Sequence, residues 1–270
     1  MKKILFMFAA ALMMIACNNE EIVTNDDVQY VSELKLNFGK GDSRVAATHS
    51  DAGLKFAWEN GDQIEIYEEG KNVTHRYTYN GESFVADHES YRMQVGKKYF
   101  AVRETYSTGV NPDTKDVLMR VETDGKCGLP YIPLISDVFD AKLDGTIATM
   151  HHLVGVVEIP VKKSEGFNKT ITQFNIYVSG KCLGGTFTAN PTLDGYITNI
   201  PDGFAYAFSE EKTNYNLSTT ATTVFIPVLP GTYENAKLNY FYAEGSGQCS
   251  IGNITVERGK ITKLNEVILE

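Results

Sequence analysis

Histidine is the residue type of this chain best suited to acid–base chemistry and metal binding, and all five histidines lie within the first 152 of 270 residues. A catalytic triad or metal site would therefore have to form without an imidazole from the second half, which excludes many hydrolase arrangements. His151 and His152 open an apolar run typical of a strand, where successive side chains point to opposite faces and cannot bind one ion together. The full set is His49, His75, His88, His151 and His152.

Other short motifs also fail to complete a catalytic or cofactor site. Gly41-Asp42-Ser43 is similar to the nucleophile block of one esterase family, but the later Asp-x-x-His which that family needs is absent. The sequence has no GxxxxGK[ST] loop, no GxGxxG after a strand and no DxDxDG calcium loop. Residues 180–185 are glycine-rich but indicate a turn between strands. We therefore predict no catalytic residue, no metal ligand and no cofactor, and we expect a protein that is not an enzyme.

The N-terminus has the pattern of a lipoprotein signal peptide. Two lysines precede an uninterrupted apolar run that ends at Ala16, and Cys17 follows directly. This resembles a bacterial lipobox, in which Cys17 is acylated and becomes the first mature residue; an ordinary cleaved signal is the alternative. Acyl chains contribute about 0.8 kcal/mol per buried methylene, so lipid on Cys17 is expected to hold the protein at the outer membrane.

The mature chain is expected to be acidic and exported. Removing residues 1–16 takes away two lysines and lowers the formal charge from −9 to −11. This charge disfavours nucleic acid as a partner. Glu20 and Glu21 resemble the surface-export signal of Bacteroidales-type lipoproteins. Three cysteines remain, Cys127, Cys182 and Cys249, whose pairing the sequence leaves open.

The elements that would position any site are β-strands. Apolar residues alternate with polar ones from Val28, and this predicts a half-buried strand formed by Val28, Tyr30, Leu34, Leu36 and Phe38. A polar loop of about fifteen residues follows. Residues 54–58 and 63–67 are interpreted as a hairpin or tight strand pair, and Asn80-Gly81 predicts the turn of a second hairpin.

The strand pattern continues to the C-terminus without a lasting helical stripe. We predict an all-β fold of two tandem β-sandwich domains, because about 100 residues suffice for one sandwich. The expected division is 1–16 signal peptide, 17–45 lipidated tether with first strand and cleavage loop, 46–145 N-terminal sandwich, and 146–270 C-terminal sandwich with the C-terminal strand.

Five segments in order behind the lipobox resemble the fimbrillin-like pilins of Bacteroidales-type bacteria, the subunits of type V pili. They are Ser43-Arg44-Val45-Ala46, FAWENGDQIEIY (56–67), HHLVGVVEIPV (151–161) with ITQFNIYVSG (171–180), FIPVLPGTY (225–233) and RGKITKLNEVIL (258–269). The resemblance implies two transthyretin-like sandwiches, export as a lipoprotein to the outer-membrane surface, and polymerisation with other pilin subunits by strand exchange.

The resemblance also implies a processing site and a donor segment. In that family a trypsin-like protease cuts after an Arg or Lys in the loop that follows the first strand, and Arg44 occupies the matching loop, with Lys40 as second candidate. The first strand then leaves a groove that a neighbour's C-terminal segment enters, here the segment of Val267 and Leu269.

The expected function is therefore adhesion as a subunit of a surface fimbria. Two alternatives stay open: a monomeric surface lipoprotein that binds glycan or another ligand on a host or bacterial surface, and a pilus anchor that retains its lipid. The short mature length leaves shaft, tip and anchor positions open, and the sequence does not name the adhesion target.

Overall fold

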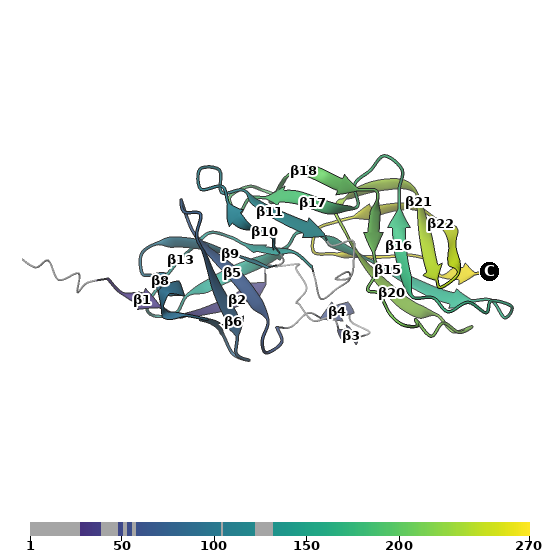
Figure 1. Cartoon of the computed structure of the whole chain (residues 1–270), viewed down its shortest axis with the longest axis horizontal. Helices are drawn as coiled ribbons and strands as arrows, with labels where there is room; N and C mark the ends of the chain where they lie inside the picture. Colours follow the sequence, from purple (N-terminus) through teal and green to yellow (C-terminus); the bar gives the residue numbers. More distant parts are fainter. Residues whose placement is uncertain (1–27, 39–47, 51–52, 56–57, 104, 122–131) are drawn as a thin grey trace, which may run out of the picture.

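The structure is a computed structural model that describes residues 28–38, 48–50, 53–55, 58–103, 105–121 and 132–270 (Figure 1). Within these ranges every regular element is a strand except η1 (Glu89–Tyr91), a single turn of 3₁₀-helix. The predicted all-β fold is confirmed. The signal peptide and Cys17 lie outside the described residues.

A first set of strands belongs to the N-terminal half of the chain. These are β1 (Tyr30–Val31), β2 (Glu33–Phe38), β3 (Thr48–Ser50), β4 (Gly53–Lys55), β5 (Gln63–Glu68), β6 (Thr74–Tyr79), β7 (Phe84–Ala86), β8 (Met93–Gln94), β9 (Lys98–Arg103), β12 (Leu134–Ser136), β13 (Phe139–Asp140) and β14 (Ile147–His152). Two short pairs, β1 with β8 and β3 with β4, stand outside the main sheet.

The main N-terminal sheet closes on itself. Its order is β12-β14-β2-β7-β6-β5-β9-β13, and β12 also pairs with β9 through Leu134 opposite Arg103 and Ile135 opposite Val102. We call the resulting ring of seven strands, from β12 round to β9, the closed sheet. Closure pairs the edges that an open sheet would leave unsatisfied, and so β2 has a strand on each side.

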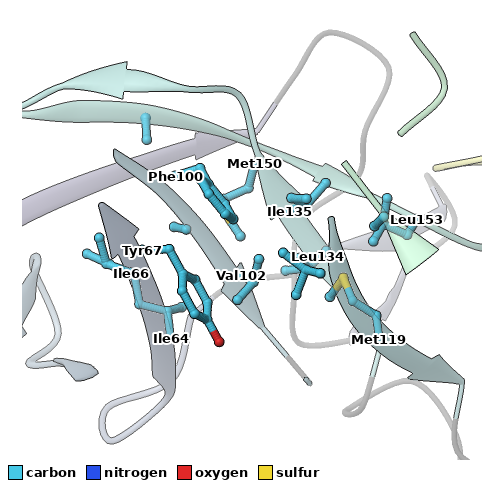
Figure 2. Close-up of a cluster of buried hydrophobic side chains, with 14 of the residues drawn as sticks. Ile64, Ile66, Tyr67, Phe100, Val102, Met119, Leu134, Ile135, Met150 and Leu153 are labelled. Atoms are coloured by element: carbon cyan, nitrogen blue, oxygen red, sulfur yellow. The ribbon is translucent and has the colours of Figure 1, made fainter. Parts of the chain in front are cut away.

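The core of this half is formed by side chains from strands all around the closed sheet. Figure 2 shows Ile64 and Ile66 of β5, Val102 of β9 and Leu134 of β12 within one cluster, and all four are at most 1% exposed. Such burial contributes about 1.5–3 kcal/mol per large side chain. Because side chains of a strand alternate between its two faces, the face that carries the large apolar residues is the one that is buried.

The sequence predicts two hairpins in this half of the chain, and one of the two forms. β6 and β7 pair around Asn80-Gly81, where Gly81 has φ +98°, as the sequence predicts. The strand pair expected across residues 59–62 is wrong, since β5 pairs with β6 and β9, whereas β4 pairs with β3. In the closed sheet β6 and β9 pair with the two edges of β5, so no edge is left for residues 54–58.

A second sheet joins the two halves of the chain. It contains β10 (Thr105–Val110), β11 (Val117–Val121), β17 (Gly184–Ala189) and β18 (Ile197–Phe204), in that order. Val117 lies opposite Ala189 and Val121 opposite Gly185, so strand pairing crosses residue 145, where the sequence placed a domain boundary. The division into two domains stays a prediction.

The C-terminal strands form two facing sheets. One has the order β20 (Thr222–Val228), β15 (Gly155–Lys163) and β23 (Ile261–Lys263), with β24 (Val267–Leu269) also on β15; the other has the order β19 (Tyr206–Phe208), β16 (Gln173–Tyr177), β21 (Gly231–Tyr242) and β22 (Gly245–Val256). A separate hydrophobic cluster includes Ile159 and Ile226 of the first sheet and Phe174 and Leu238 of the second. This arrangement is a β-sandwich.

Candidate functional site

The first candidate site is the place of β2 in the closed sheet. β2 pairs antiparallel with β7 through Leu34 opposite Phe84, and parallel with β14 from Lys35 opposite Ile147 to Phe38 opposite Met150. β2 and β14 are more than 100 residues apart in the sequence and run parallel, so no tight turn connects them. They are held together by backbone hydrogen bonds and by side-chain packing.

The side chains of β2 alternate as the sequence predicts. Leu34 is fully buried, and Leu36 and Phe38 are half-buried against the core. The Phe38 ring stacks on Trp58, with centroids 5.8 Å apart, and on His152, at 5.7 Å. β2 therefore fills an apolar channel between β7 and β14.

The single strand predicted from Val28 to Phe38 is divided in two. β1 pairs with β8 through Tyr30 opposite Gln94, whereas the Ser32 carbonyl accepts a backbone hydrogen bond from Ala86 of β7. Tyr30 is 50% exposed, with the Arg92 guanidinium 5.8 Å from its ring centroid, and Val28 precedes the strand. Tyr30 therefore does not fill the core, because the chain changes partner at Ser32, whereas Val28 is half-buried.

The predicted processing residues follow β2 directly. Lys40 and Arg44 fall in residues 39–47, between β2 and β3, and lie outside the described residues. Their processing stays a prediction.

The C-terminal residues Val267 and Leu269 occupy the sandwich of their own chain. β24 pairs parallel with β15, with Val267 opposite Val161 and Leu269 opposite Lys163. Leu269 is 1% exposed and Val267 is half-buried. β14 and β15 are separated only by residues 153 and 154, and each pairs in parallel with a strand from near one end of the chain, β14 with β2 and β15 with β24.

The paired histidines point to different neighbours. His151 Nε2 lies 3.1 Å from Asp137 Oδ2, and the His152 ring stacks on Phe38. Strand alternation separates the two imidazoles, as the sequence predicts. Among the described residues no group of three or more His, Cys, Asp or Glu side chains could hold a metal ion.

Cys182 is exposed and Cys249 is half-buried, and both are free thiols. Burial raises the pKa of the Cys249 thiol above its ordinary value. Cys127 lies outside the described residues. In the part of the chain that the structure describes, no helix is long and apolar enough to span a membrane.

Sequence reasoning missed a second candidate site, a groove on the face of the β19–β16–β21–β22 sheet that is turned away from the sandwich core. Its cavity volume is about 630 Å³, and amide and aromatic side chains line it. The only signal in the sequence is that amides recur at every second position, as in Gln173 and Asn175. Their neighbours across the sheet come from strands more than 30 residues away in the sequence.

Comparison with known proteins adds a likeness of fold. No protein-family model matches the sequence, and no curated protein matches it. A proposed cell adhesion protein from Bacteroides ovatus is similar in structure, with a TM-score of 0.57, 13% sequence identity, and coverage of 89% of this chain and 92% of that chain. Another, from Bacteroides uniformis, has a TM-score of 0.53 and 15% identity, covering 90% of this chain and 94% of that chain. The chain therefore has an all-β fold similar to that of these two Bacteroides proteins.

Proposed function

We propose that the chain is a non-enzymatic subunit of a fimbria-like adhesive fibre, exported as a lipoprotein to the outer-membrane surface. Lipid on Cys17 anchors the precursor, and cleavage after Arg44, or after Lys40, frees β2. A terminal strand of another copy then takes the place of β2. The function named for the two structurally similar Bacteroides proteins, cell adhesion, supports the adhesive part of this proposal.

The main observation that supports the proposal is the position of β2 between β7 and β14 in the closed sheet. Removing β2 leaves unpaired backbone groups on facing edges of β7 and β14, and it uncovers Phe84 and Met150, which are at most 1% exposed. Unpaired edges and exposed apolar surface both favour capture of a new strand. The processed subunit is therefore prone to assemble.

The C-terminal strand is suited to be the donor. β24 has three residues and, among the described strands, pairs on one side only, with β15, whereas β2 is paired on both sides. Leaving its own sheet costs β24 mainly the burial of Leu269, about 1.5–3 kcal/mol. β24 already runs parallel to its neighbour, as β2 does to β14.

The test compares surface protein from cells that make the unchanged chain with cells that make Lys40→Ala/Arg44→Ala. We expect the unchanged chain to begin at Val45 or Gly41 and to form SDS-resistant polymers, and the double variant to begin at lipidated Cys17 and remain monomeric. Arg92→Ala removes an exposed arginine elsewhere and serves as the matched control. Shortened polymers from the double variant would exclude this loop as the switch.

The monomeric alternative has one observation in its favour, the groove on the C-terminal sandwich. Under that reading the lipid is kept, β2 stays in place, and ligand binding is the whole function. A chain recovered from the cell surface only as lipidated monomer would favour this alternative or the anchor role.

A further inference from the structure

We propose that the groove on the β19–β16–β21–β22 sheet binds a neutral saccharide through its sugar hydroxyls and ring faces. This deepens the adhesive part of the proposed function, on which its biological role rests, by naming a ligand class. The cavity volume, about 630 Å³, lies in the range of small-molecule sites.

The strand register gathers the groove side chains into rows. Phe208 lies opposite Asn175, Asn175 opposite Asn239, and Asn239 opposite Gln248. Directly opposed residues of antiparallel strands point to the same face and have Cβ atoms about 4.5–5.5 Å apart. One row across four strands thus carries an aromatic ring and three amides.

The three amides form a hydrogen-bonded chain with free ends. Gln248 Nε2 donates to Asn239 Oδ1 at 2.6 Å, and Asn239 Nδ2 donates to Asn175 Oδ1 at 2.7 Å. Asn175 is 1% exposed and lines the groove, and its Nδ2 donates to no acceptor among the described residues. Asn175 Nδ2 is not among the fully buried polar atoms that lack a partner, so this donor is accessible from the groove and is available to an acceptor on a ligand.

A hydroxyl group matches both ends of the amide chain. The inner end, at Asn175, offers a donor, and the outer end, at exposed Gln248, offers the acceptor Oε1. Turning all three amides round exchanges donor and acceptor but still leaves one of each. A hydroxyl accepts and donates, and a saccharide carries several hydroxyls on a rigid ring.

Aromatic rings provide the other half of the recognition. Tyr206 is 40% exposed, and its ring lies 4.9 Å from Tyr177 and 6.2 Å from Phe208, centroid to centroid. Phe241 lies in the next row, opposite Gln173. Exposed ring faces of this kind bury apolar C–H surface, which one face of a pyranose ring presents.

The charges around the groove indicate a neutral ligand. No residue lining it is acidic, basic or a histidine. Lys237, on the same face, lies one row beyond the amides, opposite Tyr177. The residues that line the groove offer no opposite charge to a charged ligand, so the hydration that such a ligand loses there is not compensated by them.

The position of the groove on the sheet disfavours a peptide strand. Extended peptides are bound by backbone ladder bonds at a sheet edge. The two strands at the centre of the groove, β16 and β21, are each paired on both sides.

Figure 1 shows this sheet at the opposite end of the molecule from β1, and so from the side where the proposed lipid anchor joins.

The test is binding of the full chain, as unassembled monomer, to an array of neutral, sialylated and sulfated oligosaccharides, followed by titration with the best neutral oligosaccharide. We expect selective retention of neutral glycans. Tyr206→Ala and Gln248→Ala, both at exposed positions, should each weaken binding about tenfold. Tyr91→Ala and Gln63→Ala, exposed residues outside the groove, are the matched controls and should change it less than about twofold.

Three results would overturn the proposal: no retention of any neutral glycan, retention of charged glycans alone, or equal effects of groove and control variants in chains with matching thermal unfolding. Binding is measured without assembly, so its failure is distinct from failure of strand exchange. Saccharide binding by a chain that never polymerises would leave the groove assignment intact and exclude the fibre.

Discussion

The hydroxyl of Tyr196 donates a 2.7 Å hydrogen bond to Oδ1 of Asp137, and this bond joins the turn before β18 to the loop between β12 and β13 of the N-terminal half. The Tyr196 ring also stacks on His151, with centroids 5.0 Å apart, and the Arg258 guanidinium lies 4.7 Å from its centroid. One tyrosine thus contacts segments from both halves of the chain.

Replacing this tyrosine tests the connection between the halves. Tyr196→Phe keeps the ring and removes the bond to Asp137, and it should lower the free energy of unfolding in urea by about 0.5–1.5 kcal/mol. Tyr91→Phe, at an exposed position, should change it by less than about 0.5 kcal/mol. Equal losses in the two variants would show that the Asp137 bond does not stabilise the fold.

The burial of β2 predicts a strong contrast along one strand. Leu34→Ala removes a fully buried side chain and should destabilise the chain by about 2–5 kcal/mol. Asn37→Ala, on the exposed face of β2, should cost less than about 0.5 kcal/mol. Chemical denaturation measures both, and similar values would contradict the placement of β2 in the channel.

Alkaline pH should unfold the protein through its buried tyrosines. Burial raises the pKa of Tyr99 to about 12, although its hydroxyl accepts a hydrogen bond from the backbone N–H of Gln94. The pKa is higher in the folded than in the unfolded chain, so this stabilisation is complete below pH 10 and is lost as pH rises through about 12. Tyr99→Phe should show a shallower loss of stability from pH 10 to 12, and an unchanged slope would argue against a buried phenol.

The two described cysteines should differ in reactivity toward thiol reagents. Cys182 is exposed, whereas Cys249 is half-buried and its thiol has a raised pKa. The experiment uses a chain in which Cys17 and Cys127 are changed to Ser, so that only these two thiols can react. Because the thiolate is the reactive form, a disulfide reagent at pH 8 should label Cys182 well before Cys249. Cys182→Ser and Cys249→Ser separate the two rates, and faster labelling of Cys249 would contradict its burial.

The sequence by itself determined that the chain is built from strands and, for β2, which face is buried. Alternation placed Leu34, Leu36 and Phe38 on one face of β2, and Asn80-Gly81 specified a turn, because both signals depend on residues a few positions apart. The same local rule separated His151 from His152. It failed at Tyr30, where the polypeptide keeps an extended pattern but changes its pairing partner.

Only the tertiary structure decided which strands became neighbours. The N-terminal sheet closes because Leu134 pairs with Arg103. The two halves are linked because Val117 pairs with Ala189. The groove forms because Asn175 pairs with Asn239. An apolar or amide residue at a strand position is compatible with many partners, and the choice is made by the packing of the whole core. Strand identity is therefore local information, whereas register, closure and a site assembled across four strands are properties of the folded chain.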